Sequence, residues 1–168
     1  MTKFLLAVHV LAAIITIGPV TVAAGMFPPA ARRAAAAPDD PAGLATVRTL
    51  HRICRVYAAV AVAVPAFGLA TADRLGVLGS AWLITSIALT ALAAAVLGAA
   101  ILPRQGAALL TLATLTALDG PAGAGGADAS RAVLRTARRL GMYTGLFNLL
   151  WAAVTVLMII RPGSTTGA

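Results

Sequence analysis

Four long apolar stretches dominate the hydropathy pattern of the chain, and the segments between them hold nearly all the charged residues. The stretches cover residues 4–27, 53–72, 78–102 and 141–160. Each is about 20 to 25 residues long, enough for a helix to cross the ~30 Å hydrocarbon layer, and Arg55 is the only charge inside any of them. A helix satisfies its own backbone hydrogen bonds in lipid, whereas an isolated strand does not. The pattern predicts an all-α polytopic membrane protein, a four-transmembrane-helix bundle of two helical hairpins, in one domain over residues 1–168.

The segments between the stretches determine the expected orientation. Residues 28–52 and 103–140 are expected to form two loops on one side of the membrane. Their arginines are Arg32, Arg33, Arg48, Arg52, Arg104, Arg131, Arg135, Arg138 and Arg139. The other side carries only Lys3, the Asp73-Arg74 pair and Arg161. Because basic residues are retained on the cytoplasmic side, both loops should be cytoplasmic and both termini outside, in a multi-pass protein of a bacterial plasma membrane.

A cleaved secretory signal is a competing interpretation of the first stretch. Lys3, an apolar core and the small residues 22–24 fit that pattern loosely. Cleavage would leave Arg32 and Arg33 outside, against the charge rule. The apolar run is also longer than the hydrophobic core of a usual signal peptide, so four spanning helices are preferred.

The first loop contains a turn and a basic helical face. Residues 38–41, Pro-Asp-Asp-Pro, predict the turn. Arg48, Arg52 and Arg55 then recur at i, i+4 and i+7, which places them on one face of a helix leading into the second stretch. That helix is expected to project a basic turn or two beyond the membrane, within reach of lipid headgroups.

The second loop repeats the arginine spacing ahead of the fourth stretch. The residues concerned are Arg131, Arg135 and Arg138. Ser130 is a candidate N-cap for that helix. Gly106–Leu118 is apolar but too short to span and follows Pro103, so it predicts either an interfacial helix or a continuation of the third helix beyond a kink.

Composition and charge agree with a membrane location. Of 168 residues, 60% are hydrophobic and 11% charged, with mean hydropathy +0.94, whereas a soluble domain has roughly 25% charged residues. The net charge of +8 could indicate nucleic acid or a membrane surface. Because the arginines border apolar stretches, anionic lipid headgroups are the expected partner and nucleic acid is not. Cys54 is the only cysteine, which excludes an internal disulfide and a cysteine-rich metal site.

Small residues at helical spacing predict close helix packing. Gly141 and Gly145 form a small-xxx-small pair at the start of the fourth stretch, and Ala91, Ala95 and Ala99 form a similar stripe on the third. Such contacts can form within one chain, between copies in a homo-oligomer, or with a partner in a membrane complex. Asn148, nearer mid-membrane, is expected to make an interhelical hydrogen bond.

His9 is the main candidate for chemistry within the membrane. An ionisable side chain inside a spanning helix is costly, and it commonly marks a functional site. A ligand or proton-handling role therefore stands beside the alternative of a structural histidine with a satisfied hydrogen bond. The same depth along the helices predicts a small polar cluster around His9, formed by Thr85, Ser86 and Thr155.

Other catalytic or cofactor signals are weak. His51 cannot join His9 on one haem, because helical rise places them about 25 Å apart whereas axial ligands of one iron lie about 4 Å apart. No acidic residue lies inside any stretch, and the chain has no phosphate-binding glycine loop or nucleophile with a base at a fixed offset. Catalysis is therefore not indicated. Pro19 and Pro65 could break two helices near their middles, as in transporters.

The two ends of the chain resemble a family of uncharacterised bacterial four-helix integral membrane proteins. The resemblance lies in the first stretch, residues 4–24, and in the ending from Asn148 to residue 168. More distantly, the helix with His9 and a glycine nine residues later is similar to the first helix of HemJ-type protoporphyrinogen oxidases and CopD-type copper proteins. That similarity implies a role for His9 in binding haem, porphyrin or a metal.

Three functional hypotheses follow from the sequence. The leading one is a non-enzymatic membrane protein, an accessory or assembly component with a basic cytoplasmic face that binds membrane lipids or a protein. The alternative is a haem-, porphyrin- or metal-handling membrane protein that uses His9. A small-molecule transporter is the third.

Overall fold

The computed structural model describes residues 2–117 and 124–163, which form helices and short turns without a strand. The elements in chain order are α1 (Thr2–Ala36), α2 (Pro41–Val60), α3 (Ala63–Leu75), α4 (Ala81–Ala95), the π-helix η1 (Val96–Ile101), α5 (Leu102–Ala117) and α6 (Ala124–Ile160). They make four long helical columns, since α2 leads into α3 and α4 continues through η1 into α5. All four columns are long and apolar enough to cross a membrane. The prediction of an all-α bundle of four spanning helices is confirmed.

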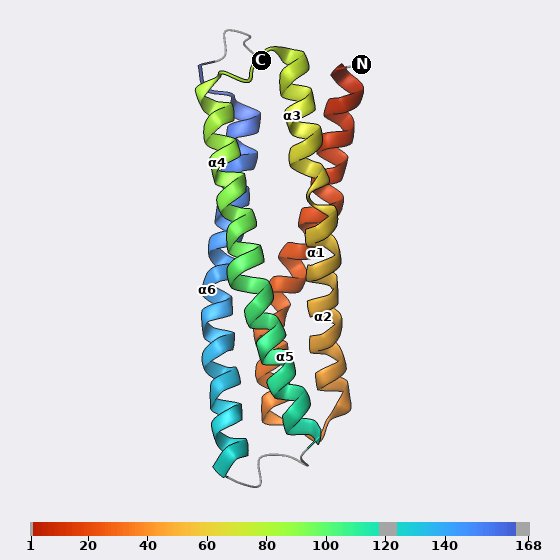
Figure 1. Cartoon of the computed structure of the whole chain (residues 1–168), viewed down its shortest axis with the longest axis vertical. Helices are drawn as coiled ribbons and strands as arrows, with labels where there is room; N and C mark the ends of the chain where they lie inside the picture. The colour runs from red at the N-terminus through yellow and green to blue at the C-terminus, as the bar shows by residue number, and fades with distance from the viewer. Residues whose placement is uncertain (1, 118–123, 164–168) are drawn as a thin grey trace.

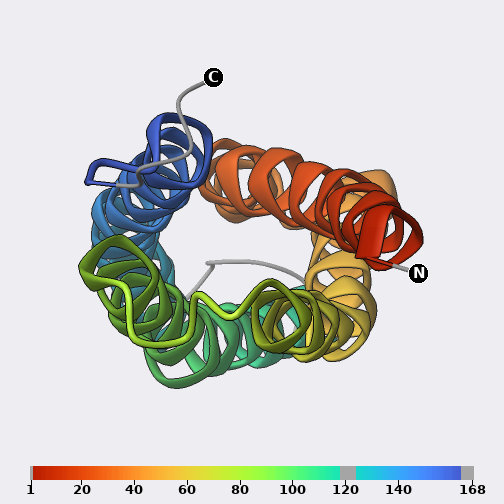
Figure 2. The ribbon, with the colours of Figure 1, turned by 90° about the horizontal axis from the view of Figure 1, so that it is seen from above.

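The columns run up and down beside one another. Figure 1 shows the start of α1 and the end of α6 at one end of the bundle, with the α3–α4 turn; we call it the terminal end. The α1–α2 turn, the end of α5 and the start of α6 lie at the opposite end. Figure 2 shows the columns in a ring, with α1 packed against α2, α3 and α6, and α5 between α2 and α6.

We call that opposite end the arginine-rich end, because it holds the arginines of the two expected loops. Those in the described helices include Arg32, Arg33, Arg48, Arg52, Arg131, Arg135, Arg138 and Arg139. The columns contain 34 to 37 residues, which corresponds to about 50–55 Å of helix. A hydrocarbon layer of ~30 Å covers only part of that length, so about 20 Å of bundle extends beyond it.

Most of the described residues in the expected loops 28–52 and 103–140 are helical. α1 continues through Pro28 and Pro29 to Ala36, and the turn before α2 is only residues 37–40. The carboxylate of Asp40 accepts a hydrogen bond from the Ala42 amide at 3.0 Å and caps α2, with Pro41 at the first helical position. The expected turn at residues 38–41 is confirmed.

The third column also continues past its proline. Gly106 to Ala117 belong to α5, so the continuation beyond Pro103 is correct, while Leu118 lies outside the described residues. The π-helix η1 precedes Pro103. In a regular α-helix the proline ring would clash with the preceding turn, and the wider π turn gives it more room. Ser130 lies inside α6 rather than before it, so the N-cap prediction was wrong.

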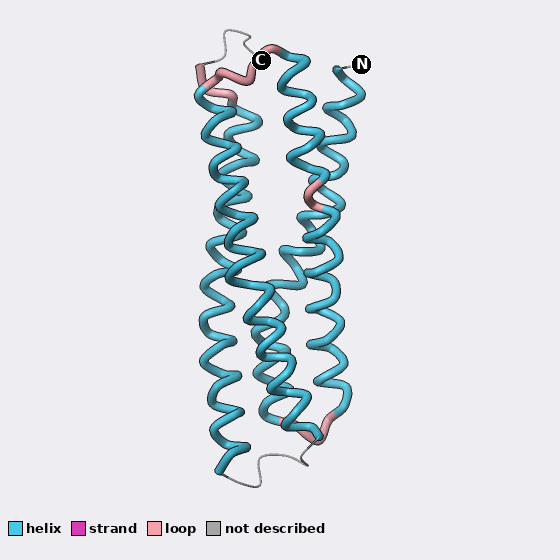
Figure 3. The backbone as a smooth tube through the Cα atoms, viewed as in Figure 1, coloured by secondary structure: helices cyan, strands magenta, loops and turns pink. Residues whose placement is uncertain are grey.

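The second column breaks just before Pro65. Residues Ala61 and Val62 form a turn between α2 and α3, visible as a short loop in the backbone trace of Figure 3. Pro65 has no N–H to donate to the Ala61 carbonyl, which instead accepts from Val64 at 3.0 Å. α1, in contrast, runs unbroken through Pro19.

The main core lies toward the arginine-rich end and the middle of the bundle. Phe27, Val47, Ile101, Leu112 and Phe147 are among its fully or almost fully buried side chains. A smaller cluster of Ala72, Trp82 and Leu83 lies at the terminal end. The outward surface is strongly apolar, with exposed side chains such as Phe4, Ile14, Leu149 and Ile159. A surface of this kind is suited to lipid rather than water, and the protein is a membrane protein.

Candidate functional site

The amphipathic sequence of α2 separates its arginines from its core residues. Val47, Leu50 and Cys54 recur at helical spacing and are buried against the bundle. Arg48 and Arg55 directly follow Val47 and Cys54 and are exposed, as is Arg52. The sequence thus builds one apolar face and one basic face on the same helix.

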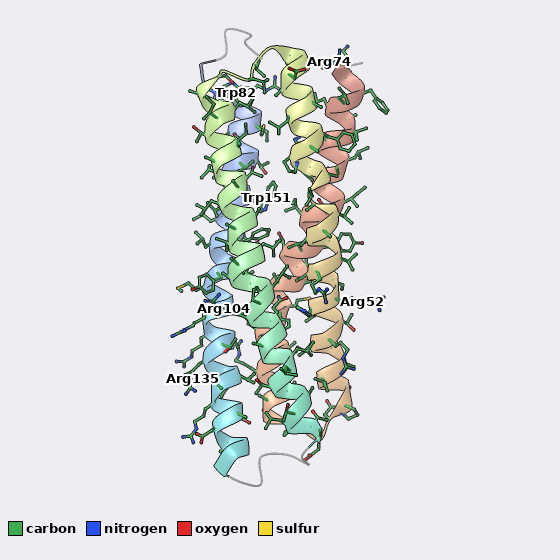
Figure 4. All side chains as sticks on the ribbon, viewed as in Figure 1. Arg52, Arg74, Trp82, Arg104, Arg135 and Trp151 are labelled. Atoms are coloured by element: carbon green, nitrogen blue, oxygen red, sulfur yellow. The ribbon has the colours of Figure 1, made fainter. Side chains whose placement is uncertain are left out.

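The basic face of α2 lines a groove together with α5. The groove has a volume of about 600 Å³, and its lining residues are Arg48, His51, Arg52, Arg55, Val56, Ala59 and Leu109. We call it the α2/α5 groove. The three arginines predicted on one helical face therefore share one concave surface, and Figure 4 shows Arg52 on the outer side of α2.

The buried side-chain amide of Gln105 links α5 to the helix that carries the groove arginines, α2. Gln105 is completely buried, and its Oε1 atom accepts a hydrogen bond from Nδ1 of His51 at 3.2 Å. Its Nε2 atom donates to the Sγ atom of Cys54 at 3.6 Å. Because an amide oxygen can only accept, the proton in the first bond lies on Nδ1 of His51. Nε2 of the neutral ring then carries a lone pair, so it accepts hydrogen bonds and donates to an anion only when the ring is protonated.

Gln105 is a functional candidate that the sequence reasoning did not select. The available signal was the helical spacing of Gln105, Ala108, Leu112 and Leu115, all of which are buried. A lone amide in an otherwise apolar stripe requires a polar partner, because burying it without one costs free energy. The identity of the partners depends on how α2 packs against α5, which periodicity alone does not give.

No carboxylate in the described residues neutralises the arginines of the groove. Asp39 and Asp40 precede α2, and Asp73 lies at the terminal end. Within residues 2–117 and 124–163, the one ion pair is that of Arg131 with Asp128, at 2.7 Å and largely exposed. An exposed pair of this type contributes little free energy. The groove therefore presents positive charge available to an anion.

A second set of arginines lies on the outside of α6. Arg131, Arg135 and Arg138 are all exposed, and Figure 4 shows Arg135 pointing away from the bundle. Arg104 differs from them. Its guanidinium lies over the ring of Tyr143, 4.7 Å from the centroid, and donates to the Ala100 carbonyl at 2.9 Å. Arg104 thus links α5 to α6, whereas the α6 set is available to lipid or a partner.

His9 packs in the contact between α1 and α3. Its Nδ1 atom lies 2.9 Å from the carbonyl oxygen of Val64 and donates to it. Gly68 provides the space, because a Cβ atom at that position would lie 2.8 Å from Cε1 of His9. The hydrogen bond holds the imidazole in one tautomer and links the two helices at the terminal half of the bundle.

The hydroxyl groups expected around His9 are not hydrogen-bonded to it. Thr85, Ser86 and Thr155 donate to carbonyls of their own helices, at 2.8, 2.8 and 2.9 Å. Thr85 and Thr155 are exposed, while Ser86 is buried. The structure therefore does not gather these side chains into a hydrogen-bonded cluster at His9, because each hydroxyl is satisfied within its own helix.

The donor atoms near His9 do not fit a metal ion. The described ranges contain no group of three or more His, Cys, Asp or Glu side chains that could hold one. His9 offers one free ring nitrogen, and His51 lies about 20 Å away along α2 and α3 by helical rise. Copper and haem iron both require further ligands or an enclosing pocket, so no step is assigned to such a group.

The small-residue stripes face outward. Gly141 and Gly145 are exposed, and a Cβ atom added to either would meet no atom within 4 Å. The alanine stripe is exposed as well; its members are Ala91, Ala95 and Ala99. Close packing within the chain is therefore not their use. Oδ1 of Asn148 is buried without a partner among the described residues, so the expected interhelical hydrogen bond is not made there.

The α2/α5 groove thus combines exposed arginines, a concave shape and a buried hydrogen-bonded amide beneath them. Guanidinium groups and the imidazole ring of His51 occupy one part, and aliphatic side chains form the rest of the lining. Such a surface can bind an anionic molecule that also has an apolar part. Comparison of the chain with protein-family models, with curated proteins and with solved structures finds no match.

Proposed function

We propose that the protein is a non-enzymatic integral membrane protein whose arginine-rich end lies in the cytoplasm and binds anionic lipid headgroups. It acts as an accessory or assembly component of a bacterial plasma membrane. The observation that carries the proposal is the presence of two exposed arginine faces, on α2 and α6, at the arginine-rich end of the bundle.

Electrostatics at the membrane surface supports lipid binding. Each basic residue near an anionic leaflet contributes about 1 kcal/mol of attraction, and this contribution decays within a Debye length of the surface. The α2 face runs into the start of the second apolar stretch, and the α6 face precedes the start of the fourth. Their arginines therefore fall close to headgroup depth. No acidic residue lies in the four apolar stretches, which supports a role without proton transfer or catalysis within the membrane.

Lipid enrichment in nanodiscs tests the lipid half of the proposal. The full chain is reconstituted in a mixture of phosphatidylcholine and phosphatidylglycerol, and the lipids retained with the protein are quantified. The wild type should enrich phosphatidylglycerol. A variant with Gln at positions 48, 52, 55, 131, 135 and 138 should not. Arg74→Gln, at the terminal end, is the matched control and should behave as wild type. Equal enrichment in the wild type and the six-site variant would reject lipid binding.

Cysteine labelling tests the orientation. Cys54 is buried, so it provides a low background for an added cysteine. Ala37→Cys lies in the α1–α2 turn and Gly79→Cys in the α3–α4 turn, and both positions are exposed. A membrane-impermeant maleimide applied to intact cells should label Gly79→Cys and spare Ala37→Cys. The reverse labelling would place the arginine-rich end outside and reject the proposed orientation.

A further inference from the structure

We propose that the α2/α5 groove is a specific site for one phospholipid whose headgroup is a phosphate monoester. The phosphate lies among Arg48, Arg52 and Arg55, beside the ring of His51, and an acyl chain runs along Val56 and Ala59. The inference rests on the proposed function, since it selects one lipid class at one of the two arginine faces.

Buried hydrogen bonds join the two helices that form the groove, which distinguishes it from a freely solvated row of arginines on one helix. Gln105 is completely buried and bonds to His51 on one side and Cys54 on the other. These bonds fix α5 against α2 and orient the imidazole at the wall of the groove. Lining residues come from both helices, since Leu109 belongs to α5. The lining of this groove includes no arginine of α6, so the two faces differ in more than position.

The polarity of the groove matches the polarity of a lipid. Along α2 the lining changes from Arg48, His51, Arg52 and Arg55 to Val56 and Ala59. This change runs from the arginine-rich end toward the second apolar stretch, over about 16 Å of helix. A bound phospholipid in the adjacent leaflet has the same direction, with its headgroup outward and its chains toward mid-membrane. A soluble anion would use only the charged part.

The charge of the groove favours a doubly charged headgroup. Three guanidinium groups face the groove, and the described residues place no carboxylate in an ion pair with them. A phosphodiester lipid supplies one negative charge, whereas a phosphate monoester carries about −1.5 to −2 and three acceptor oxygens. Guanidinium groups bind such oxygens in bidentate pairs, which are shorter and stronger than neutral hydrogen bonds. The monoester neutralises more of the cluster.

The size of the groove favours a compact headgroup with few chains. Its volume of about 600 Å³ lies within the ~300–1,000 Å³ range of small-molecule sites. Its aliphatic lining consists of Val56, Ala59 and Leu109. Of these, Val56 and Ala59 follow the arginines along α2 and provide a path for one acyl chain.

Native mass spectrometry of the full chain in detergent tests the inference. The protein is titrated with phosphatidate, phosphatidylglycerol and cardiolipin, and separately with glycerol 3-phosphate as a headgroup without chains. Two variants with the same loss of charge are compared. Arg48→Gln, Arg52→Gln and Arg55→Gln remove the groove arginines, and Arg131→Gln, Arg135→Gln and Arg138→Gln remove the matched set on α6. All six positions are exposed, so both triple variants should fold, as an unchanged gel-filtration profile would verify.

The wild type should bind one phosphatidate about tenfold more tightly than either other lipid, as expected for a charge-assisted bidentate site. The groove variant should lose this preference, and the α6 variant should keep it while binding all anionic lipids more weakly. If both variants weaken all lipids equally, the specific site is rejected and general anionic-lipid binding stands. If the wild type binds no anionic lipid, both fail. Glycerol 3-phosphate binding as tightly as phosphatidate would show a soluble phosphate ligand and overturn the lipid assignment.

Discussion

Substitution of Gly68 by alanine should separate α3 from His9 and destabilise the protein. A Cβ atom at position 68 would lie 2.8 Å from Cε1 and 3.1 Å from Nδ1 of His9. These distances are too short for a real contact, so the imidazole must move. Its hydrogen bond to the Val64 carbonyl, 2.9 Å long, would then be strained or lost.

The magnitude follows from three contributions. Overpacking a well-filled contact costs about 1–3 kcal/mol. An interhelical hydrogen bond in a membrane contributes about 0.6 kcal/mol on average and up to about 1.7. Alanine in a helix gains up to about 1 kcal/mol over glycine. The net expected loss is about 0.6–3.7 kcal/mol in the free energy of unfolding, measured by thermal or denaturant unfolding in detergent.

Two further variants make the test specific. Gly25→Ala is the matched control, because a Cβ atom there would meet nothing within 4 Å, and it should leave stability unchanged or slightly raised. In a His9→Ala background, Gly68→Ala should cost little, because the ring that it would strike is absent. Additive losses in the double variant would refute the contact between His9 and Gly68.

Three other substitutions test separate contacts. Asp40→Ala removes the cap of α2 and should lower the free energy of unfolding by about 0.5–2 kcal/mol in the same assay; an unchanged midpoint would mean that the cap is not formed. Arg104→Gln removes the guanidinium that stacks on Tyr143 and should lower the free energy of unfolding by about 0.5–2 kcal/mol. The exposed Arg135→Gln should change it by no more than about 0.5 kcal/mol. Equal effects of the two substitutions would show that the stacking does not stabilise the protein. Gln105→Leu keeps a side chain of similar volume but removes the hydrogen bonds to His51 and Cys54. It should change the free energy of unfolding by only about 1 kcal/mol while reducing the preference for phosphatidate. Retention of the full preference would show that the amide does not position the groove.

The four spans and the basic face of α2 could be predicted because they depend on local periodicity. An uncharged run of sufficient length specifies a spanning helix, and the spacing of Arg48, Arg52 and Arg55 specifies one helical face. The helices extend further than the apolar runs, because the prolines that follow those runs do not end them. α1 passes Pro28 and Pro29, and α5 passes Pro103 after the π turn of η1.

The side-chain partners could not be predicted, because they depend on how the helices pack. His9 bonds to a backbone carbonyl of α3, and Gln105 joins α2 to α5. The outward position of Gly141 and Gly145 also depends on how the helices pack. A small-residue spacing identifies a face suited to close approach, and only the rotation of α6 in the bundle decides whether another helix of the chain is there.

Native mass spectrometry of the wild-type protein, released from its own membrane into a mild detergent, tests the central claim most directly. The spectrum reports the lipids that remain bound without any added lipid. Binding through the arginine-rich end predicts that the protein retains at least one anionic phospholipid, and that the species with Gln at the six arginine positions does not. A wild-type protein that retains only zwitterionic lipid, or none, would contradict the proposed function.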